Sequence, residues 1–97
     1  MLSKTQIRFL KAQAHSLHAL VIIGANGLSP AVAKEIDSAL NHHELIKVKL
    51  GNLPDEEQEE MIEQICQGQN AEFVSKIGHI AIFYRENPEK RSYQLPK

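Results

Sequence analysis

Residues 20–30 place a strand, a tight turn and a helix start in direct succession, and this arrangement restricts the fold more than any other part of the chain. Leu20-Val21-Ile22-Ile23 is wholly apolar and bounded by glycine, which predicts a strand buried on both faces. The turn Gly24-Ala25-Asn26-Gly27 holds residue types that tolerate positive φ. Ser29-Pro30 then supplies a capping hydroxyl and a proline for the first helical position. A strand that runs directly into a helix predicts a β-α-β crossover to a parallel neighbour.

The rest of the chain predicts two more helices and three more strands. The helices begin at the Ser3/Gln6 capping box and at Asp55, whose carboxylate suits the positive end of a helix. Alternating apolar and polar residues predict a strand at 44–50, and residues 73–77 and 80–85 have the pattern of two further strands. Gly78-His79 joins the last two strands as a hairpin.

The element order is therefore α-β-α-β-α-β-β, an α/β (α+β) fold with a mixed four-stranded sheet packed with helices. Two crossovers make the first three strands parallel, and the hairpin adds an antiparallel strand. With 97 residues and 42% hydrophobic residues, the chain suffices for one core. We expect a single domain over residues 1–97, in which 88–97 form a polar tail.

The formal net charge is −1, but the charges are segregated along the chain. Residues 55–63 hold six of the twelve acidic residues and no basic residue. The rest of the chain carries 11 basic and 6 acidic residues, a net charge of +5, and no acidic residue precedes Lys34. The binding of a polyanion depends on the local electrostatic potential of the surface that it approaches rather than on the net charge of the whole protein. One acidic helix beside a basic remainder is therefore compatible with a nucleic-acid partner.

The Gly24–Gly27 turn is the local motif with the most direct chemical meaning. Glycines let backbone amides approach a phosphodiester, and the helix that starts at Ser29 aims its positive end at the same region. KH domains clamp single-stranded nucleic acid with a GXXG loop of this kind. The alternative is a strand-to-helix connector selected for its backbone angles alone. A nucleotide-cofactor loop is disfavoured because G-x-G-x-x-G and G-K-[ST] are both absent.

Basic side chains accompany this turn along the chain. Lysines cover the surface of any soluble protein, but phosphate neutralisation dominates nucleic-acid affinity, and a basic set around a glycine turn serves it. The set consists of Lys4, Arg8, Lys11, Lys34, Lys47 and Lys49, joined by His15 and His18.

Other chemistry receives less support from the residues. The pairs His15/His18 and His42/His43 lack an HExxH motif or a cysteine partner, so we expect no metal and no cofactor. The acidic helix could hold Mg²⁺ for a nuclease, but six acids on one face are more often solvated. The single Cys66 excludes an intramolecular disulfide and is expected in the core. The few aromatic residues form no stacking platform of the RRM kind, so RNA contacts should be made mainly to backbone and shape.

Several ordered blocks resemble the CRM (YhbY-type) RNA-binding domain. They are His15–Ser29, Glu35-Ile36, Ala39-Leu40, His43–Lys49, Ile77-Gly78 and Ile82–Arg85. The likeness covers essentially the whole chain, as in the stand-alone bacterial members of the family. It implies a fold akin to the C-terminal domain of translation initiation factor three, and association with precursors of the large ribosomal subunit. It also implies RNA contacts at Gly24, Ala25, Asn26, Gly27, Lys47, Lys49 and Arg85.

The chain departs from the family pattern at two places that concern charge. His18-Ala19 stand where relatives often have lysine and proline, and His79 stands where a lysine often follows the hairpin glycine. If both histidines border the RNA, their protonation below about pH 6.5 should strengthen binding.

Taken together, the sequence predicts a non-catalytic RNA-binding protein that assists assembly of the large ribosomal subunit. We expect a cytoplasmic monomer, because no apolar run approaches the length of a membrane span and no secretory signal is visible. Two alternatives stay open, a small metal-dependent nuclease and an adaptor whose acidic helix recruits a ribosomal protein. The predicted RNA-binding residues are Gly24, Ala25, Asn26, Gly27, Lys47, Lys49, Arg8, Lys11, Lys34, Arg85, His18 and His79.

Overall fold

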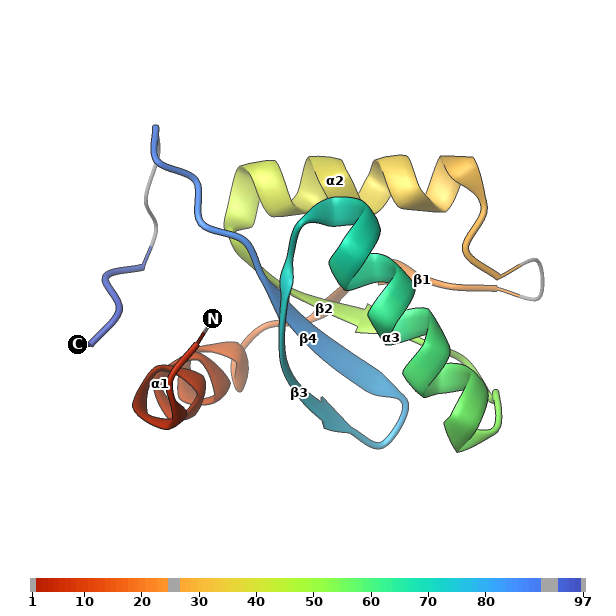
Figure 1. The fold of residues 1–97 in the computed structure, drawn as a ribbon, viewed down its shortest axis with the longest axis horizontal. Helices are drawn as coiled ribbons and strands as arrows, with labels where there is room; N and C mark the ends of the chain where they lie inside the picture. The colour runs from red at the N-terminus through yellow and green to blue at the C-terminus, as the bar shows by residue number, and fades with distance from the viewer. Residues whose placement is uncertain (1, 25–26, 90–92, 97) are drawn as a thin grey trace.

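Helices and strands alternate along the chain in the predicted order α-β-α-β-α-β-β (Figure 1). The computed structural model describes residues 2–24, 27–89 and 93–96. Its elements are α1 (Lys4–Ala14), β1 (Ala19–Ile22), α2 (Pro30–His43), β2 (Leu45–Lys49), α3 (Asp55–Gln69), β3 (Glu72–Ile77) and β4 (Ile80–Tyr84). None of the helices in this described part has the length and apolar character needed to cross a bilayer.

The four strands form one mixed sheet in the order β1-β2-β4-β3. β1 pairs parallel with β2, and β4 pairs antiparallel with both β2 and β3. The strands β1, β2 and β3 therefore run in the same direction, as predicted, and β4 lies between β2 and β3. The ends of β1, β2 and β3 consequently meet at one edge of the molecule, together with the beginnings of α2 and α3 (Figure 1).

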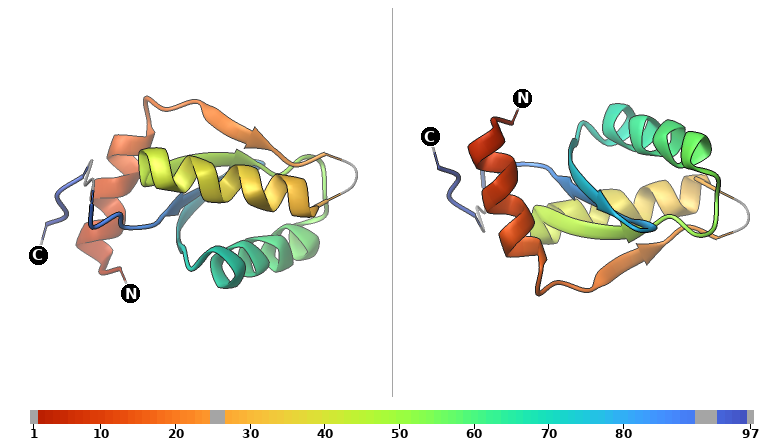
Figure 2. Two further views of the ribbon diagram at one scale, coloured as in Figure 1. Left: turned by 90° about the horizontal axis from the view of Figure 1, so that it is seen from above. Right: turned by 90° about the horizontal axis from the view of Figure 1, so that it is seen from below.

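The helices divide between the two faces of the sheet (Figure 2). One face packs on α2 and α3, with Val48 and Phe83 of the sheet against Ile36 and Ile65 of those helices. The other face packs on α1, whose Leu10 joins a second buried cluster of sheet residues. The strand alternation explains this division, because successive side chains of β2 point to opposite faces.

The C-terminal residues return to α1 rather than running free. Tyr93 and Leu95 pack on the second cluster, and the side-chain amide of Gln6 donates to the carbonyl of Pro96 at 3.0 Å. The predicted polar tail is thus packed in part. Both chain ends lie at the opposite end of the molecule from the junction between β1 and α2 (Figure 1), so the tail leaves that junction uncovered.

Local sequence signals account for the helix boundaries. The Ser3/Gln6 capping box is present at the start of α1, as predicted. The Ser29 hydroxyl accepts from the amide of Val32 at 3.2 Å, and Pro30 occupies the first turn of α2. Three acidic residues, beginning with Asp55, lie in the first turn of α3, where the helix dipole favours them.

The prediction that the first strand is buried on both faces is wrong. Val21 and Ile23 are buried, but Leu20 is 52% exposed and Ile22 is 65% exposed. The reason is that β1 is an edge strand and that α1, only 11 residues long, spans about 16 Å and packs over β2 and β3 instead. A continuous apolar run indicates a buried strand only when helices cover both faces.

Candidate nucleic-acid interface

The glycine turn between β1 and α2 is closed by its own backbone. The amide of Gly27 donates to the carbonyl of Gly24 at 3.0 Å, and Ser29 donates to the Gly27 carbonyl at 3.0 Å. Ala25 and Asn26, two of the predicted RNA-binding residues, lie outside the described residues. The cap at Ser29 fixes the start of α2 two residues after the turn, so the positive end of that helix borders it.

The backbone conformation requires a glycine at one of the two glycine positions of the turn but not at the other. Gly27 has a φ of +69°, which favours glycine over any L-residue with a side chain. Gly24 has no positive φ, and a Cβ built on it would meet nothing within 4 Å. The described fold therefore gives no internal reason for glycine at position 24. Open space above a bare backbone is what close approach of an external chain would require.

Lysines of β2 lie beside this turn, on the face of the sheet that α1 partly covers. Lys49 is exposed and pairs across strands with Ile22, two residues before Gly24. Lys47 is half-buried on the same face, and its ammonium donates to the carbonyl of Leu17 at 2.9 Å. Both lysines of β2 thus lie on one face of the strand, with Lys47 the more restrained of the two.

The last turn of α1 extends this basic surface. Lys11 and His15 line an open hollow of about 460 Å³ together with Lys47 and Ile77. We call Lys11, His15, Lys47 and Lys49 the basic face. Arg8 is exposed one turn earlier on α1, and Lys34 is exposed on the second turn of α2.

The charges of the basic face are unneutralised within the described residues. There, the ion pairs join Lys76 to Asp55 at 3.6 Å and Arg85 to Asp37 at 3.0 Å, and neither involves the basic face. The carboxylates of α3 belong to the helix on the opposite face of the sheet, since α3 packs in the other cluster. The acidic helix of the sequence thus lies on the opposite side of the sheet from the basic face.

Arg85, implied by the family resemblance, lies away from the turn. It follows β4, which runs opposite to β1, and therefore stands at the other end of the sheet. Its guanidinium donates to the carbonyls of Gln69 and Asp37 and to the side chain of Asn41, all at 2.9–3.0 Å. Arg85 thus joins α2 to the end of α3, and it is not among the residues that the structure brings together at the turn.

His79 is engaged with α3. The amide of the fully buried Gln58 donates to the carbonyl of Leu53 at 2.7 Å and accepts from the ammonium of Lys76 at 2.9 Å. Those two partners fix the orientation of the amide, so its nitrogen donates to Nδ1 of His79 at 2.9 Å. The ring of His79 therefore contacts α3 through Gln58.

His18 lies before β1, at the end of that strand away from Gly24. It lines a largely apolar pocket of about 280 Å³ with His43, Leu20 and Tyr93. Among the described residues, no group of three or more potential ligands is arranged to hold a metal ion.

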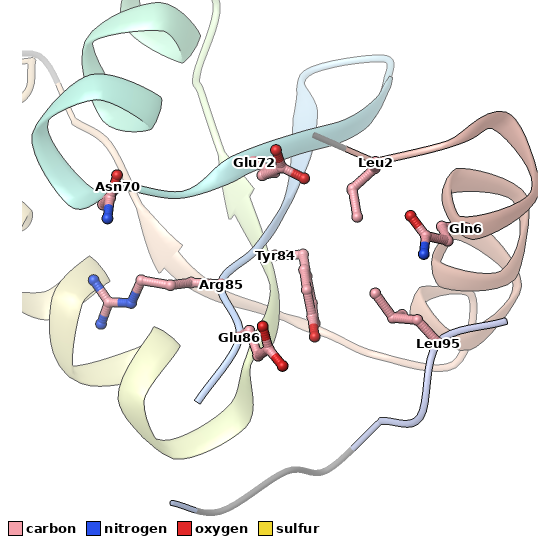
Figure 3. Close-up of a pocket in the computed structure, with 8 residues that line it drawn as sticks. All are labelled: Leu2, Gln6, Asn70, Glu72, Tyr84, Arg85, Glu86 and Leu95. Atoms are coloured by element: carbon pink, nitrogen blue, oxygen red, sulfur yellow. The ribbon is translucent and has the colours of Figure 1, made fainter. Parts of the chain in front are cut away.

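A more polar hollow lies between α1, the beginning of β3 and the end of β4 (Figure 3). It has a volume of about 420 Å³ and is lined by Glu72 and Glu86, with Tyr84 between them. The side chain of Arg85 extends away from Tyr84 toward Asn70 (Figure 3). Two carboxylates with the nearby guanidinium engaged elsewhere disfavour a phosphate group here.

Cys66 is half-buried against the first core cluster, close to its predicted place. Burial raises the pKa of its thiol, and the carboxylates of Glu72 and Glu63 raise it further. A protonated thiol at neutral pH is a poor nucleophile.

The sequence did not reveal that Ile22 and Ile77, exposed by 65% and 62%, would remain uncovered on the basic face. Four consecutive apolar residues in the first strand carry no alternation from which the exposed side could be read. His15 was recognised as basic, but its place beside Lys47 depends on how α1 crosses the sheet.

Both the sequence and the fold match known proteins. The CRS1 / YhbY (CRM) domain matches residues 2–85. An RNA-binding protein of Haemophilus influenzae is 45% identical over 96 residues, covering 99% of this chain and 96% of that protein. A protein of Pseudomonas aeruginosa, named as a probable RNA-binding protein, is 35% identical over 88 residues, covering 91% of this chain and 85% of that one. The solution structure of a hypothetical protein from Staphylococcus aureus matches with a TM-score of 0.84 and 35% identity, over 99% of this chain and 100% of that chain.

Proposed function

Because the chain belongs to the CRS1/YhbY (CRM) domain family, we propose that it binds RNA, with the sugar–phosphate chain held at the Gly24–Gly27 turn and beside the basic face. The relative in Haemophilus influenzae is named as an RNA-binding protein, and the one in Pseudomonas aeruginosa as a probable RNA-binding protein. Phosphate oxygens would accept from the backbone amides of the turn, including those of Ala25 and Asn26. Lys11, Lys47 and Lys49 would neutralise phosphates that follow the turn along the RNA.

Gly24 is the observation that carries this proposal. Neither a positive φ nor a neighbouring atom within 4 Å requires a glycine at position 24. The residue nevertheless lies beside the positive end of α2 and near the exposed Lys49. A ligand backbone approaching that position explains the missing side chain. The same position on an ordinary connector would accept alanine without loss.

The charge distribution supports the same mode of binding. If about four phosphates are neutralised, by the three lysines and by Lys34 or Arg8, log affinity should fall against log salt with a slope near −3 for single strands. A slope near zero would contradict the electrostatic part of the proposal. The α3 carboxylates on the opposite face would repel RNA and so restrict it to one side of the molecule.

The test is a charge inserted at the turn, with a matched glycine as control. Gly68 in α3 also has open space around it and no positive φ, so Gly68→Asp adds the same charge away from the turn. We expect Gly24→Asp to abolish binding to a single-stranded RNA oligonucleotide, while Gly68→Asp retains it and both variants keep the parent circular dichroism spectrum. Equal binding by the two variants would remove the turn from the site.

We assign the RNA to precursors of the large ribosomal subunit, as the family resemblance implies, and the protein to assembly of that subunit in the cytoplasm. Crosslinking in cells followed by RNA sequencing tests this assignment. Enrichment of precursor ribosomal RNA by the parent, and its loss with Gly24→Asp, is the expected result. Enrichment of unrelated transcripts would overturn the assignment while leaving RNA binding intact.

The protein is proposed to bind RNA without cleaving it. Incubation of the purified protein with structured and single-stranded RNA, with and without Mg²⁺, should leave both RNAs intact. Magnesium-dependent cleavage that disappears when the carboxylates of residues 55–63 are neutralised would instead support the nuclease alternative.

The acidic helix offers a surface that RNA binding leaves unused. Glu56, Glu57, Glu59, Glu60 and Glu63 are all exposed on α3, on the face away from the basic lysines. A basic ribosomal protein is the partner that this charge would suit. Copurification of such a protein that persists after RNase treatment would support the contact, and loss of the protein with the RNA would exclude it.

A further inference from the structure

The last row of side chains on the basic face is unusually apolar. Strand pairing places Ile22 opposite Lys49, Lys49 opposite Ile80, and Ile80 opposite Ile77. Paired residues point to the same side of a sheet, so these four side chains form one row across all four strands, which we call the terminal row. Its two ends, Ile22 and Ile77, are 65% and 62% exposed.

The position of α1 explains why the terminal row is bare. The preceding rows contain Ile82, Leu45 and Tyr84, which are at most 5% exposed and pack against Leu10 of α1. The terminal row lies beyond this cover, at the edge of the sheet where β1 enters the glycine turn. Within the described residues it is the place where several large aliphatic side chains of one sheet face remain open to solvent.

The surroundings of the terminal row are cationic. Lys49 stands inside the row, Lys47 is one row behind it, and Lys11 lines the hollow next to Ile77. Ile22 is two residues from Gly24. An apolar strip about 14 Å wide, from three strand spacings, thus adjoins both the turn and the lysines that we assign to phosphates.

We infer that the terminal row is a nucleobase platform, on which unstacked bases of a single-stranded RNA lie while their phosphates contact the turn and the lysines. The inference rests on the proposed RNA binding and adds a base-contacting part to it. It differs from an aromatic stacking platform, because the contact is made by isoleucine side chains. The apolar contribution comes from removing base and isoleucine surface from water.

Charge favours RNA over other occupants. A second copy of the chain on the same surface would bring Lys49 against its own equivalent and repel it. An external protein segment would have to present apolar and acidic residues together to fit this surface. A nucleotide combines an apolar base with an anionic phosphate, which is the pairing that this surface offers.

The experiment compares an oligouridine with an abasic oligonucleotide of the same length and charge. The parent should bind oligouridine at least tenfold more tightly than the abasic strand, if each isoleucine buries a moderate apolar area. The double variant Ile22→Thr/Ile77→Thr keeps β-branched residues at both exposed strand positions. It should lose this preference by weakening oligouridine binding alone, with an unchanged salt slope.

Two further variants make the result decisive. Lys49→Gln should weaken the binding of both oligonucleotides by the same factor, and it should lower the slope of log affinity against log salt by about one. Ile77→Phe enlarges the platform and should increase the preference for oligouridine, which a merely unfolded variant could not do. Equal binding of the two oligonucleotides by the parent would overturn the platform and leave backbone binding standing.

Failure of the platform is distinguishable from failure of the proposed function. If the parent binds neither oligonucleotide, RNA binding itself fails and the platform with it. If the threonine variant changes the oligomeric state of the protein instead of its preference between the two strands, the terminal row is a self-association surface and the platform is overturned.

Discussion

The ammonium of Lys47 donates to the backbone carbonyl of Leu17 at 2.9 Å, and so connects β2 to the segment between α1 and β1. One side chain thereby holds the end of α1 in place and presents a positive charge on the basic face. Lys49, two residues later, lies on the same face without such a contact among the described residues and is more exposed.

Comparing the two lysines distinguishes the effect of a positive charge on RNA binding from the effect of a hydrogen bond on the stability of the fold. Lys47→Met removes the donor to Leu17, so we expect a loss of about 1 kcal/mol in the free energy of unfolding, together with weaker RNA binding. Lys49→Met should weaken RNA binding to a similar extent and change the free energy of unfolding by less than about 0.5 kcal/mol. Urea denaturation and titration with an RNA oligonucleotide measure the two effects. Equal stabilities of the two variants would show that the contact to Leu17 contributes nothing.

The two glycines of the turn should respond in opposite ways to alanine. Gly27→Ala forces an L-residue to a φ of +69°, which should cost about 1 kcal/mol of stability. Gly24→Ala meets open space, so stability should be kept or slightly raised, while RNA affinity falls because a methyl group now covers the backbone. Thermal unfolding and RNA titration of both variants check this. Unchanged affinity of Gly24→Ala would mean that no ligand approaches position 24.

Much of the fold could be predicted because its signals are local. The Ser3 and Ser29 caps, the alternation around Val48 and the hairpin glycine each act within a few residues. What could not be predicted depends on how distant elements cover one another. Whether Ile22 is buried is decided by where α1 crosses the sheet, and no pattern within residues 20–23 records that.

The candidate site divides in the same way. The glycine turn and the lysines of β2 could be assigned from sequence, because a strand's alternation and a turn's residue types are short-range properties. Arg85 and His79 were also expected at the site, but their hydrogen bonds lead to α2 and α3. A charged residue identified from sequence can equally well be joining two helices.

Gln58 should be important for stability because it is fully buried and its side chain contacts three polar groups. Its amide joins the carbonyl of Leu53, the ring of His79 and the ammonium of Lys76. Gln58→Leu leaves these groups without their partner, and we expect a loss of about 2–3 kcal/mol in the free energy of unfolding. Urea denaturation measures it. RNA affinity of the folded fraction should be unchanged, and a variant as stable as the parent would contradict this account.

The same contact bears on the pH dependence of RNA binding. The ring of His79 contacts Gln58 of α3, and His18 precedes β1, at the end of that strand away from Gly24. We now expect the double variant His18→Ala/His79→Ala to show the same change in affinity between about pH 5.5 and about pH 7.5 as the parent. A pH response lost in the double variant would restore these histidines to the site.

Stability should fall at alkaline pH through Cys66. Burial, with the nearby Glu72 and Glu63, raises the pKa of this thiol above its ordinary value of 9.0. Because the folded-state pKa is the higher one, the contribution is complete below the unfolded pKa and is lost as pH rises above it. Between about pH 8 and about pH 10 the melting temperature of the parent should decrease more steeply than that of Cys66→Ala. Tyr93, whose pKa burial also raises, is common to both proteins and cancels in this comparison. Parallel curves would contradict the assignment.

Variants of Arg85 distinguish most clearly between a residue that binds RNA and a residue that stabilises the fold. Its guanidinium reaches Asp37, Asn41 and Gln69 and ties α2 to the end of α3, and its side chain is 19% exposed. Arg85→Met should therefore lower the free energy of unfolding by about 2 kcal/mol. Arg85→Lys should recover only part of this loss, because an ammonium cannot reproduce the planar fork of donors. Neither variant should change RNA affinity or the salt slope at a temperature where both are folded. If instead stability is kept while the salt slope drops by about one, Arg85 contacts phosphate, and the RNA must extend along the sheet to the end opposite the glycine turn.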